Sequence, residues 1–542
     1  MRVDRRRDDS GARARVAPPT SRPAIVAPQA PLWRPADWLV ALALTALTVL
    51  SRLPFRARMI YAWDGGLFAR ALQDYNVVPH YPQPPGYIFY VGTAKLVQAL
   101  TGWDANATYV AVSIGAASLT VGALYLLGTL IFGRLAGLLT AALALTSVSF
   151  WFFSEIAYPY TVLALGSSVL GSICWALATG RFRWPPLAAL AFGSIAGFRQ
   201  DLLIFLGPLF AVCYLLALGS AGTPGGWRWT GRAWRQLLLG LCGGAAGIAA
   251  WWIATDLASE GWGSLWRALT IQSAAVERGT SAFATGSTGL RGNATLLVWF
   301  SKDALHLAAF PALAYFLQWP LHPHREGWRP LFLLLWLLPA AGFYLLVHIG
   351  EAGYVFSFLP AALLAAGAGL TRAAGALVEN LPRARSARHA TALRVVLATA
   401  LAALIVPYHA WLFVGSARLV SAERLGCKDD AIAAAVATIA DNFPPATTEI
   451  VTSTYLQHLA IYLPHYRRVR FLPPERDLVF EAAPGVERVV VFDLEMVQRT
   501  PHRDRWSLLA LGCNGRYHLA TVPAVGSRFE FDAARFQLEV TR

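Results

Sequence analysis

Charged residues are scarce in this sequence. Asp, Glu, Lys and Arg make up 14% of its 542 residues, whereas roughly 25% is typical of soluble domains. Hydrophobic residues reach 56%, and the mean hydropathy is positive at +0.46. This composition excludes a water-soluble fold and indicates a protein that crosses a membrane several times.

Cysteine is also rare, because the chain has only five. That number excludes a dense disulfide framework. Cys174, Cys213 and Cys242 lie inside apolar runs, where a thiol behaves as a small hydrophobic side chain. Cys427 and Cys513 fall in the polar C-terminal segment, and they could pair if this segment faces an oxidising compartment.

About eleven apolar segments are candidates for membrane-spanning helices, because roughly 20 apolar residues cross the hydrocarbon core. A count of ten or twelve is also compatible with the short fifth segment and with the tight seams at Gly133 and Arg199. The segments run approximately over 38–53, 107–131, 135–152, 160–179, 185–198, 202–219, 237–254, 295–318, 330–348, 354–371 and 394–415.

Arginine clusters predict how these segments are oriented. The net charge of +15 does not indicate a nucleic-acid partner, because the arginines lie in short groups between apolar runs. Every second connection is basic: Arg134; Arg181 and Arg183; Arg228, Arg232 and Arg235; Arg325 and Arg329; Arg372, Arg383, Arg385, Arg388 and Arg394. The positive-inside rule places these connections and the N-terminus in the cytoplasm. The alternate connections, including residues 54–106 and 255–294, then face outward.

The two ends of the chain differ from the apolar middle. Residues 1–35 contain many arginines and too little apolar surface to fold, so we expect a disordered cytoplasmic tail. Residues 416–542 have turn signals and alternating patterns that predict a soluble domain. Its expected elements are a helix over Asp429–Asn442, strands over Glu449–Thr452 and Glu487–Phe492, and a hairpin over Arg528–Val540. The predicted fold is therefore an all-α polytopic transmembrane bundle, residues 36–415, with a small extracytoplasmic α/β domain.

The first outward loop contains the most informative residue. Asp64 follows Trp63 and precedes Gly65 and Gly66. Glycine would let this carboxylate approach a bound substrate closely, where it could act as a general base or hold a divalent cation. The competing interpretation is that Asp64 caps a helix that starts at Gly65. Local spacing does not separate the two.

The order of elements over roughly the first 370 residues resembles the GT-C glycosyltransferases. The likeness is to the bacterial protein O-mannosyltransferase and aminoarabinose transferase-like members. A first helix is followed by Asp64 and then by the His/Pro-Pro segment 80–85; farther on, Glu351 and Tyr354 precede Leu359-Pro360, similar to the family's Tyr-plus-Leu-Pro segment. The resemblance implies that a sugar moves, with inversion, from a polyprenyl-phosphate donor in the bacterial inner membrane to an envelope acceptor outside.

The resemblance also implies roles for individual residues. Asp64 would be the base and could hold Mg²⁺ or Mn²⁺ as a cofactor. Arg199 would stabilise the departing lipid phosphate. The expected substrate-binding residues are His80, Glu155, Arg199, Lys302, Glu351 and Tyr354. The sequence departs from the family in two places: Gly65 stands where many relatives have a second acid, and Glu155 comes slightly before the expected acid.

Most of these residues also have a structural interpretation. Arg199 could pair with Asp201 or extend to the membrane interface, and Lys302 could pair with Asp303. His80 could bond backbone, and Glu351 could be a solvated loop charge. The segment 262–276 has apolar and polar residues interleaved as in a helix that lies in the interface.

Two other classes of protein compete with the transferase. A transporter of a lipid or envelope precursor would bury ionisable groups near the membrane midplane, sometimes in two related halves. Here the acids gather in outward loops and no repeat is visible. A passive membrane anchor does not require outward loops as long as these.

Overall fold

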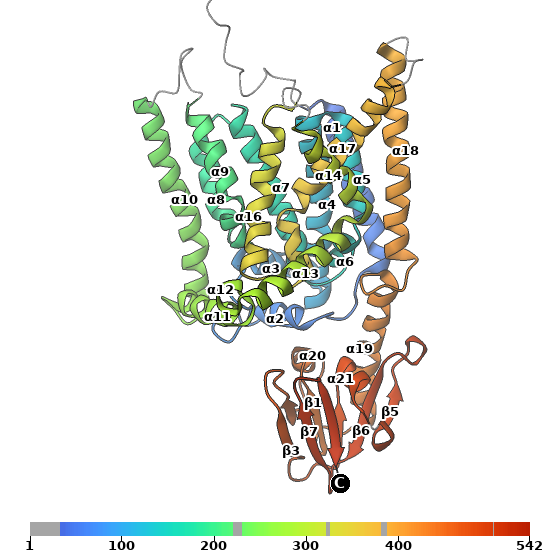
Figure 1. Cartoon of the computed structure of the whole chain (residues 1–542). Helices are drawn as coiled ribbons and strands as arrows, with labels where there is room; N and C mark the ends of the chain where they lie inside the picture. Colours follow the sequence, from blue (N-terminus) through green and yellow to red (C-terminus); the bar gives the residue numbers. More distant parts are fainter. Residues whose placement is uncertain (1–32, 220–229, 321–325, 381–386, 502, 542) are drawn as a thin grey trace, which may run out of the picture.

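The structure is a computed structural model that describes residues 33–219, 230–320, 326–380, 387–501 and 503–541. A bundle of helices stands on a small C-terminal domain (Figure 1). The expected N-terminal tail lies almost wholly outside the described residues. Four of the expected cytoplasmic arginines also lie outside them: Arg228, Arg325, Arg383 and Arg385.

Nine helices of the described residues are long and apolar enough to cross a membrane. They are α1 (Pro35–Arg52), α4 (Ala105–Phe132), α7 (Tyr160–Ala178), α9 (Asp201–Gly219), α10 (Gly231–Ala258), α13 with α14 (Ser287–Leu305 and Ala309–Gln318), α16 (Arg329–Leu346), α17 (Leu359–Glu379) and α18 (Ala387–Val414). A tenth crossing is formed if α5 (Arg134–Thr146) and α6 (Val148–Ser154), which are bent by 60°, count as one span. The protein is therefore a multi-pass membrane protein.

The expected count of about eleven spans becomes nine or ten. Every expected segment is helical, but the fifth, α8 (Pro185–Ile195), has only 11 residues. At 1.5 Å per residue it reaches about half of the hydrocarbon thickness. The expected eighth span is also interrupted, because the backbone of His306 has a positive φ of 41° between α13 and α14.

The centre of the bundle is formed by α4, α7 and α17, which are largely buried, whereas α1, α10 and α18 are mostly exposed to the surroundings. Small residues allow the central helices to approach closely. A Cβ atom on Gly128 of α4 would lie 2.8 Å from the Cα of Gly137 in α5. This is the small-residue contact expected of helices that pack within lipid.

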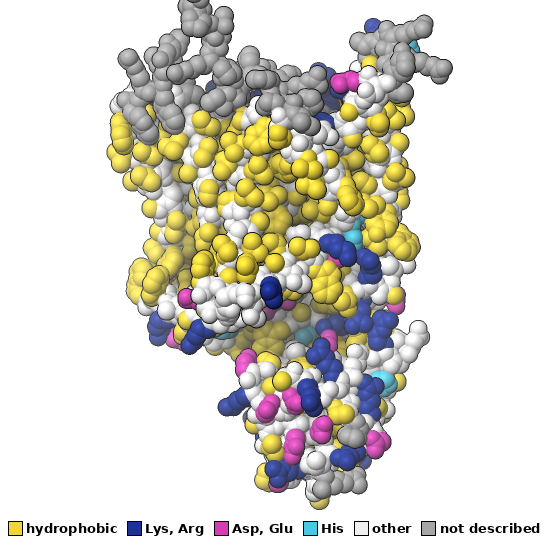
Figure 2. All heavy atoms as spheres, in the orientation of Figure 1, with side chains coloured by type: hydrophobic (Ala, Val, Ile, Leu, Met, Phe, Trp, Pro, Cys, Tyr) yellow, Lys and Arg dark blue, Asp and Glu magenta, His cyan; other side chains and the backbone are white. Residues whose placement is uncertain are grey.

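One end of the bundle bears several short helices that face the C-terminal domain (Figure 1). These are α2 (Trp63–Ala71), α3 (Ile88–Thr101), α11 (Ser264–Thr280) and α12 (Ala282–Thr285). Figure 2 shows that the yellow hydrophobic band ends here, at a fringe of Lys and Arg side chains. Trp266 and Ile271 of α11 are exposed, as is Trp262 just before it. That exposure fits the helix predicted to lie in the membrane interface.

The C-terminal domain combines helices with two sheets. Helix α19 (Ala422–Asn442) precedes β1 (Thr448–Thr452), α20 (Leu456–Tyr462), β2 (Val469–Phe471), β3 (Leu478–Glu481), β4 (Arg488–Val491), α21 (Leu494–Arg499), β5 (Ser507–Ala510), β6 (His518–Pro523), β7 (Arg528–Asp532) and β8 (Gln537–Thr541). The five-stranded sheet has the order β2-β1-β4-β6-β5, in which β2, β1 and β4 are parallel. The second sheet has the order β3-β7-β8. The helix, the two strands and the hairpin predicted from the sequence are confirmed.

Candidate functional site

Asp64 lies in the first turn of α2, but it does not cap this helix. The N-cap is Ala62, and Asp64 is the second helical residue. Its carboxylate instead accepts a hydrogen bond of 2.9 Å from the side-chain amide of Gln83, in the Pro-rich loop that follows α2. The interpretation of Asp64 as a helix cap is therefore wrong, because the carboxylate turns away from the helix end and into the protein.

The two glycines after Asp64 have a packing role. A Cβ atom on Gly65 would lie 3.2 Å from the carbonyl oxygen of Ala157 in the bundle. A Cβ atom on Gly66 would lie 2.3 Å from the Cβ of Gln457 in α20. Helix α2 is thus packed closely between the bundle and the C-terminal domain, and the spacing at Gly66 leaves no room for a side chain.

Arg199 is buried between α8 and α9. Its Nε and Nη2 atoms both lie 2.9 Å from a carboxylate oxygen of Asp201, so the pairing considered from the sequence is present. Three aromatic rings surround the guanidinium, with their centres at 4.9 Å for Tyr160, 5.0 Å for Tyr354 and 5.7 Å for Tyr87. Burial alone would lower the pKa of Arg199, but Asp201 and these tyrosines raise it well above its ordinary value. The side chain therefore remains charged inside an aromatic cage.

Asp64 interacts electrostatically with both Arg199 and Glu351. Burial raises the pKa of the Asp64 carboxyl, while the bond from Gln83 and the charge of Arg199 lower it. Glu351 precedes the short helix at Ala352–Ser357, and burial together with the charge of Asp64 raises its pKa to about 7. Tyr354 contacts Arg199 and also lies within the field of Asp64. The structure thus brings together four of the residues singled out from the sequence: Asp64, Arg199, Glu351 and Tyr354.

The C-terminal domain contributes residues that the sequence did not reveal. Lys428 of α19 lies 2.9 Å from a carboxylate oxygen of Glu495, and its ammonium is 4.8 Å from the centre of the Tyr61 ring. Its positive charge also acts on Glu351 and lowers the pKa of that carboxyl. Lys428 therefore lies beside the site and belongs to the C-terminal domain. No local pattern marks it, because its neighbours are set by the docking of two distant parts of the chain.

Three of the predicted residues lie in other surroundings. Glu155 is buried beside Arg52 and accepts a bond of 3.0 Å from the indole of Trp151. His80 is half-buried in the loop after α2 and has a positive φ of 66°. Lys302 is exposed near the end of α13, where it influences Asp303. The contacts of these three residues do not join them to Asp64, and their roles in binding stay predictions.

The expected Mg²⁺ or Mn²⁺ at Asp64 stays a prediction. Among the described residues, no three His, Cys, Asp or Glu side chains are placed to hold a metal ion together. The partner of the Asp64 carboxylate in the structure is the side-chain amide N–H of Gln83. No step of the reaction proposed below is therefore assigned to a metal.

Comparisons with known proteins give a likeness only at the level of structure. No protein-family model matches the sequence, and no curated protein matches it either. The apo form of ArnT from Cupriavidus metallidurans is 14% identical, with 90% of this chain and 98% of that chain covered and a TM-score of 0.52. ArnT bound to undecaprenyl phosphate is 14% identical, with 91% and 99% covered and a TM-score of 0.50. ArnT belongs to the GT-C superfamily.

The chain has a GT-C fold. The fold expected from the sequence resemblance is thereby confirmed. The oligosaccharyltransferase AglB from Archaeoglobus fulgidus is more distant: it is 13% identical, with 84% of this chain and 70% of that chain covered and a TM-score of 0.45. In the GT-C fold of this chain, Asp64, Arg199 and Glu351 come from three separate connections, and Asp64 interacts electrostatically with each of the other two. Helix α2, which carries Asp64, lies at the end of the bundle that faces the C-terminal domain (Figure 1).

Proposed function

We propose that this protein is a membrane glycosyltransferase that moves a sugar from a polyprenyl-phosphate donor to a hydroxyl group of an envelope acceptor. The observation that carries the proposal is the meeting of the Asp64 carboxylate and the caged Arg199 at one end of a GT-C bundle. The undecaprenyl phosphate bound to ArnT supports a donor of the same class. Because sugar and acceptor differ among proteins of one fold, the fold does not identify either of them.

The reaction follows from the charges in the site. Asp64 takes the proton of the acceptor hydroxyl while the hydroxyl oxygen forms a bond to the anomeric carbon of the sugar. The bond between this carbon and the phosphate oxygen breaks on the opposite face, so the configuration inverts. Polyprenyl phosphate leaves with the electron pair. Its charge is stabilised by the edge of the Arg199 guanidinium that Asp201 does not occupy.

The environment of Asp64 suits a base. Burial raises the pKa of the carboxylate and thereby its proton affinity, which favours proton transfer, while the hydrogen bond from Gln83 and the charge of Arg199 lower this pKa and favour the ionised form. Glu351 and Tyr354 lie beside it and would bind sugar hydroxyls. Lys428 and Glu495 would face the acceptor from the C-terminal domain.

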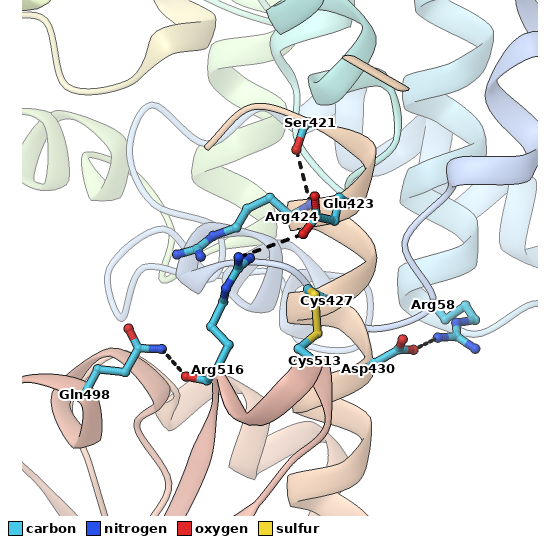
Figure 3. The surroundings of a disulfide bond; sticks show 9 residues. All are labelled: Arg58, Ser421, Glu423, Arg424, Cys427, Asp430, Gln498, Cys513 and Arg516. Atoms are coloured by element: carbon cyan, nitrogen blue, oxygen red, sulfur yellow. Dashed lines mark hydrogen bonds and ion pairs between the residues drawn. A yellow bond between two sulfur atoms is a disulfide. The ribbon is translucent and has the colours of Figure 1, made fainter. Parts of the chain in front are cut away.

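We place this site on the outer face of the bacterial inner membrane. The basic connections at Arg134, Arg181 and Arg329 support a cytoplasmic position for the end of the bundle remote from the C-terminal domain. Cys427 and Cys513 are joined by a disulfide bond (Figure 3). Such bonds persist in oxidising compartments, which supports an extracytoplasmic C-terminal domain.

Replacement of Asp64 by Asn tests the proposal. The amide has nearly the same shape but takes up no proton, so we expect the transfer rate to fall by roughly a factor of 10² to 10⁴. Mass spectrometry of envelope glycans and glycolipids from a deletion strain and its parent first identifies the missing sugar. Transfer is then measured with purified protein in liposomes and the corresponding polyprenyl-phosphate sugar.

The matched control is Asp74→Asn, since Asp74 is an exposed acid in the same loop. This variant should transfer sugar at the wild-type rate. An unchanged rate for Asp64→Asn at normal expression would show that Asp64 is not the base. An envelope that is identical with and without the gene would contradict the proposed function as a whole.

A further inference from the structure

Side chains of the C-terminal domain hold the backbone that leads from α1 to α2. The first of these side chains is Asp429 of α19, which is only 4% exposed. Its carboxylate accepts the backbone N–H of Arg58 at 2.9 Å and 3.1 Å, the backbone N–H of Met59 at 2.6 Å and the Arg58 Nε–H at 3.0 Å. Asp430 also pairs with the Arg58 guanidinium (Figure 3). One buried carboxylate thus satisfies two successive backbone donors across 370 residues of sequence.

The next residue, Ile60, makes hydrogen bonds to the C-terminal domain through both its backbone N–H and its backbone carbonyl. The N–H of Ile60 donates to the hydroxyl of Tyr462 at 2.9 Å. Nε2 of His458 lies 2.7 Å from the carbonyl oxygen of Ile60. Burial lowers the pKa of His458 to about 4, so the ring is neutral at physiological pH and donates this hydrogen bond. Residues 58–60 are called the strap below. The strap ends four residues before Asp64.

Helix α2 itself is fixed from the same side. Gly66 packs directly on Gln457, which stands next to His458 in α20. The ring of Trp63 lies 6.1 Å from that of Phe471 in β2. Asp64 therefore lies between two anchored neighbours, with the strap before it and Gly66 after it.

The disulfide bond fixes the helix that carries Asp429. Cys427 of α19 is bonded to Cys513, which lies between β5 and β6, and Asp430 on the same turn faces Arg58 (Figure 3). The two residues between them pair with Glu495, in the case of Lys428, and with Arg58, in the case of Asp429. One turn of α19 is thus joined to the C-terminal sheet, to the strap and to Glu495 beside the site.

We propose that the C-terminal domain positions the catalytic carboxylate, with Asp429 as the positioning residue that holds the strap and thereby the Asp64 helix. This inference rests on the proposed function of Asp64 as the base. A base displaced by about 1 Å can lose a factor of about 100 in rate without loss of substrate binding. The C-terminal domain is then part of the catalytic machinery, although it does not carry the base.

The test uses Asp429→Asn in the full-length protein in detergent or nanodiscs. The amide cannot accept all the bonds that the carboxylate accepts, so hydrogen exchange at the amides of residues 58–60 and of α2 should be at least about tenfold faster. We expect kcat to fall by roughly tenfold to a hundredfold while the donor KM changes less than about twofold. Tyr462→Phe removes only one hydroxyl acceptor and should change both readouts in the same direction, by about threefold.

Glu423→Gln is the matched control. Glu423 also lies on α19, but it faces Arg516 of the C-terminal domain at 3.8 Å and not the strap (Figure 3). Its variant should show wild-type exchange and kcat. Unchanged exchange of the strap in Asp429→Asn, or faster exchange with an unchanged kcat, would overturn the inference. If the wild-type protein transfers no sugar, the proposed function fails, while exchange in α2 still shows whether the C-terminal domain holds the Asp64 helix.

Discussion

At the scale of single residues, Asp64 is governed by two opposing effects. Burial favours its neutral form, whereas the Gln83 amide and the Arg199 charge favour the carboxylate. A base needs both, because it must be ionised before the reaction and must bind a proton during it. Gln83 is the partner that the sequence did not identify. It lies 19 residues away in an irregular loop, and only the folded loop brings its amide to Asp64.

Replacement of Gln83 by Leu tests this balance through the pH dependence of the reaction. The variant loses a hydrogen bond to the ionised form of Asp64, so the pKa of Asp64 should rise further. Since transfer requires the carboxylate, activity increases with pH through this pKa. The acidic limb of the kcat/KM profile should therefore move to higher pH, and activity at a fixed low pH should fall.

The control for this profile is Gln98→Leu, since Gln98 bonds the backbone of Trp103 at the end of α3. Its acidic limb should coincide with that of the wild-type protein. A limb that stays in place or moves to lower pH in Gln83→Leu would mean that the group titrating in the profile is not Asp64.

At the scale of elements, the sequence predicted what is locally encoded. Long apolar runs identified α4, α7 and α17, and alternation identified the hairpin of β7 and β8, because each pattern repeats with the period of its own structure. The sequence does not predict the packing of α2 between the bundle and the C-terminal domain, because a Gly65-Gly66 pair contributes nothing to a hydrophobic periodicity. From the sequence, the pair is expected to let a substrate approach Asp64 closely. In the structure the two glycines allow the backbone of α2 to pack closely against Ala157 and Gln457.

Gly66→Ala tests the packing of α2. The added methyl group would meet Gln457 at 2.3 Å, which is too close for any rotamer change to relieve. We expect a loss of about 1 to 3 kcal/mol in stability, seen as a lower Tm, together with reduced transfer. Gly92→Ala in α3 is the control, because a Cβ atom there meets no atom within 4 Å. That variant should be neutral or slightly stabilised, since Ala is the better helix former.

A double variant separates the contact from a general effect of alanine. Gln457→Gly removes the Cβ atom that the new methyl group would meet, so Gly66→Ala should cost less stability in the Gln457→Gly background than in the wild-type background. The coupling is measured as a double-mutant cycle. Additive changes would show that the two residues are not in the contact described.

At the scale of the whole molecule, the site is formed by residues of both the helical bundle and the C-terminal domain, which are separate segments of the sequence. Asp64, Arg199, Glu351 and Tyr354 could be selected from the sequence because they stand in connections that the arginine pattern predicts to face outward. Lys428, Asp429 and His458 could not, because their partners lie more than 60 residues away and no periodicity reports on such pairs. Cys427 and Cys513 were recognised as a candidate pair from their shared polar setting, and the structure joins them.

The last prediction concerns which side of the membrane the C-terminal domain faces. Positive connections at one end and a disulfide-bonded domain at the other both favour an outward C-terminal domain. Val525 is 86% exposed on that domain, and Trp184 is 73% exposed at the start of α8. In a Cys242→Ser background, a cysteine at position 525 should react with a membrane-impermeant maleimide in cells whose inner membrane is intact. A cysteine at position 184 should react only after that membrane is opened. The reverse pattern would place Asp64 in the cytoplasm, where an outward-facing transfer reaction could not take place.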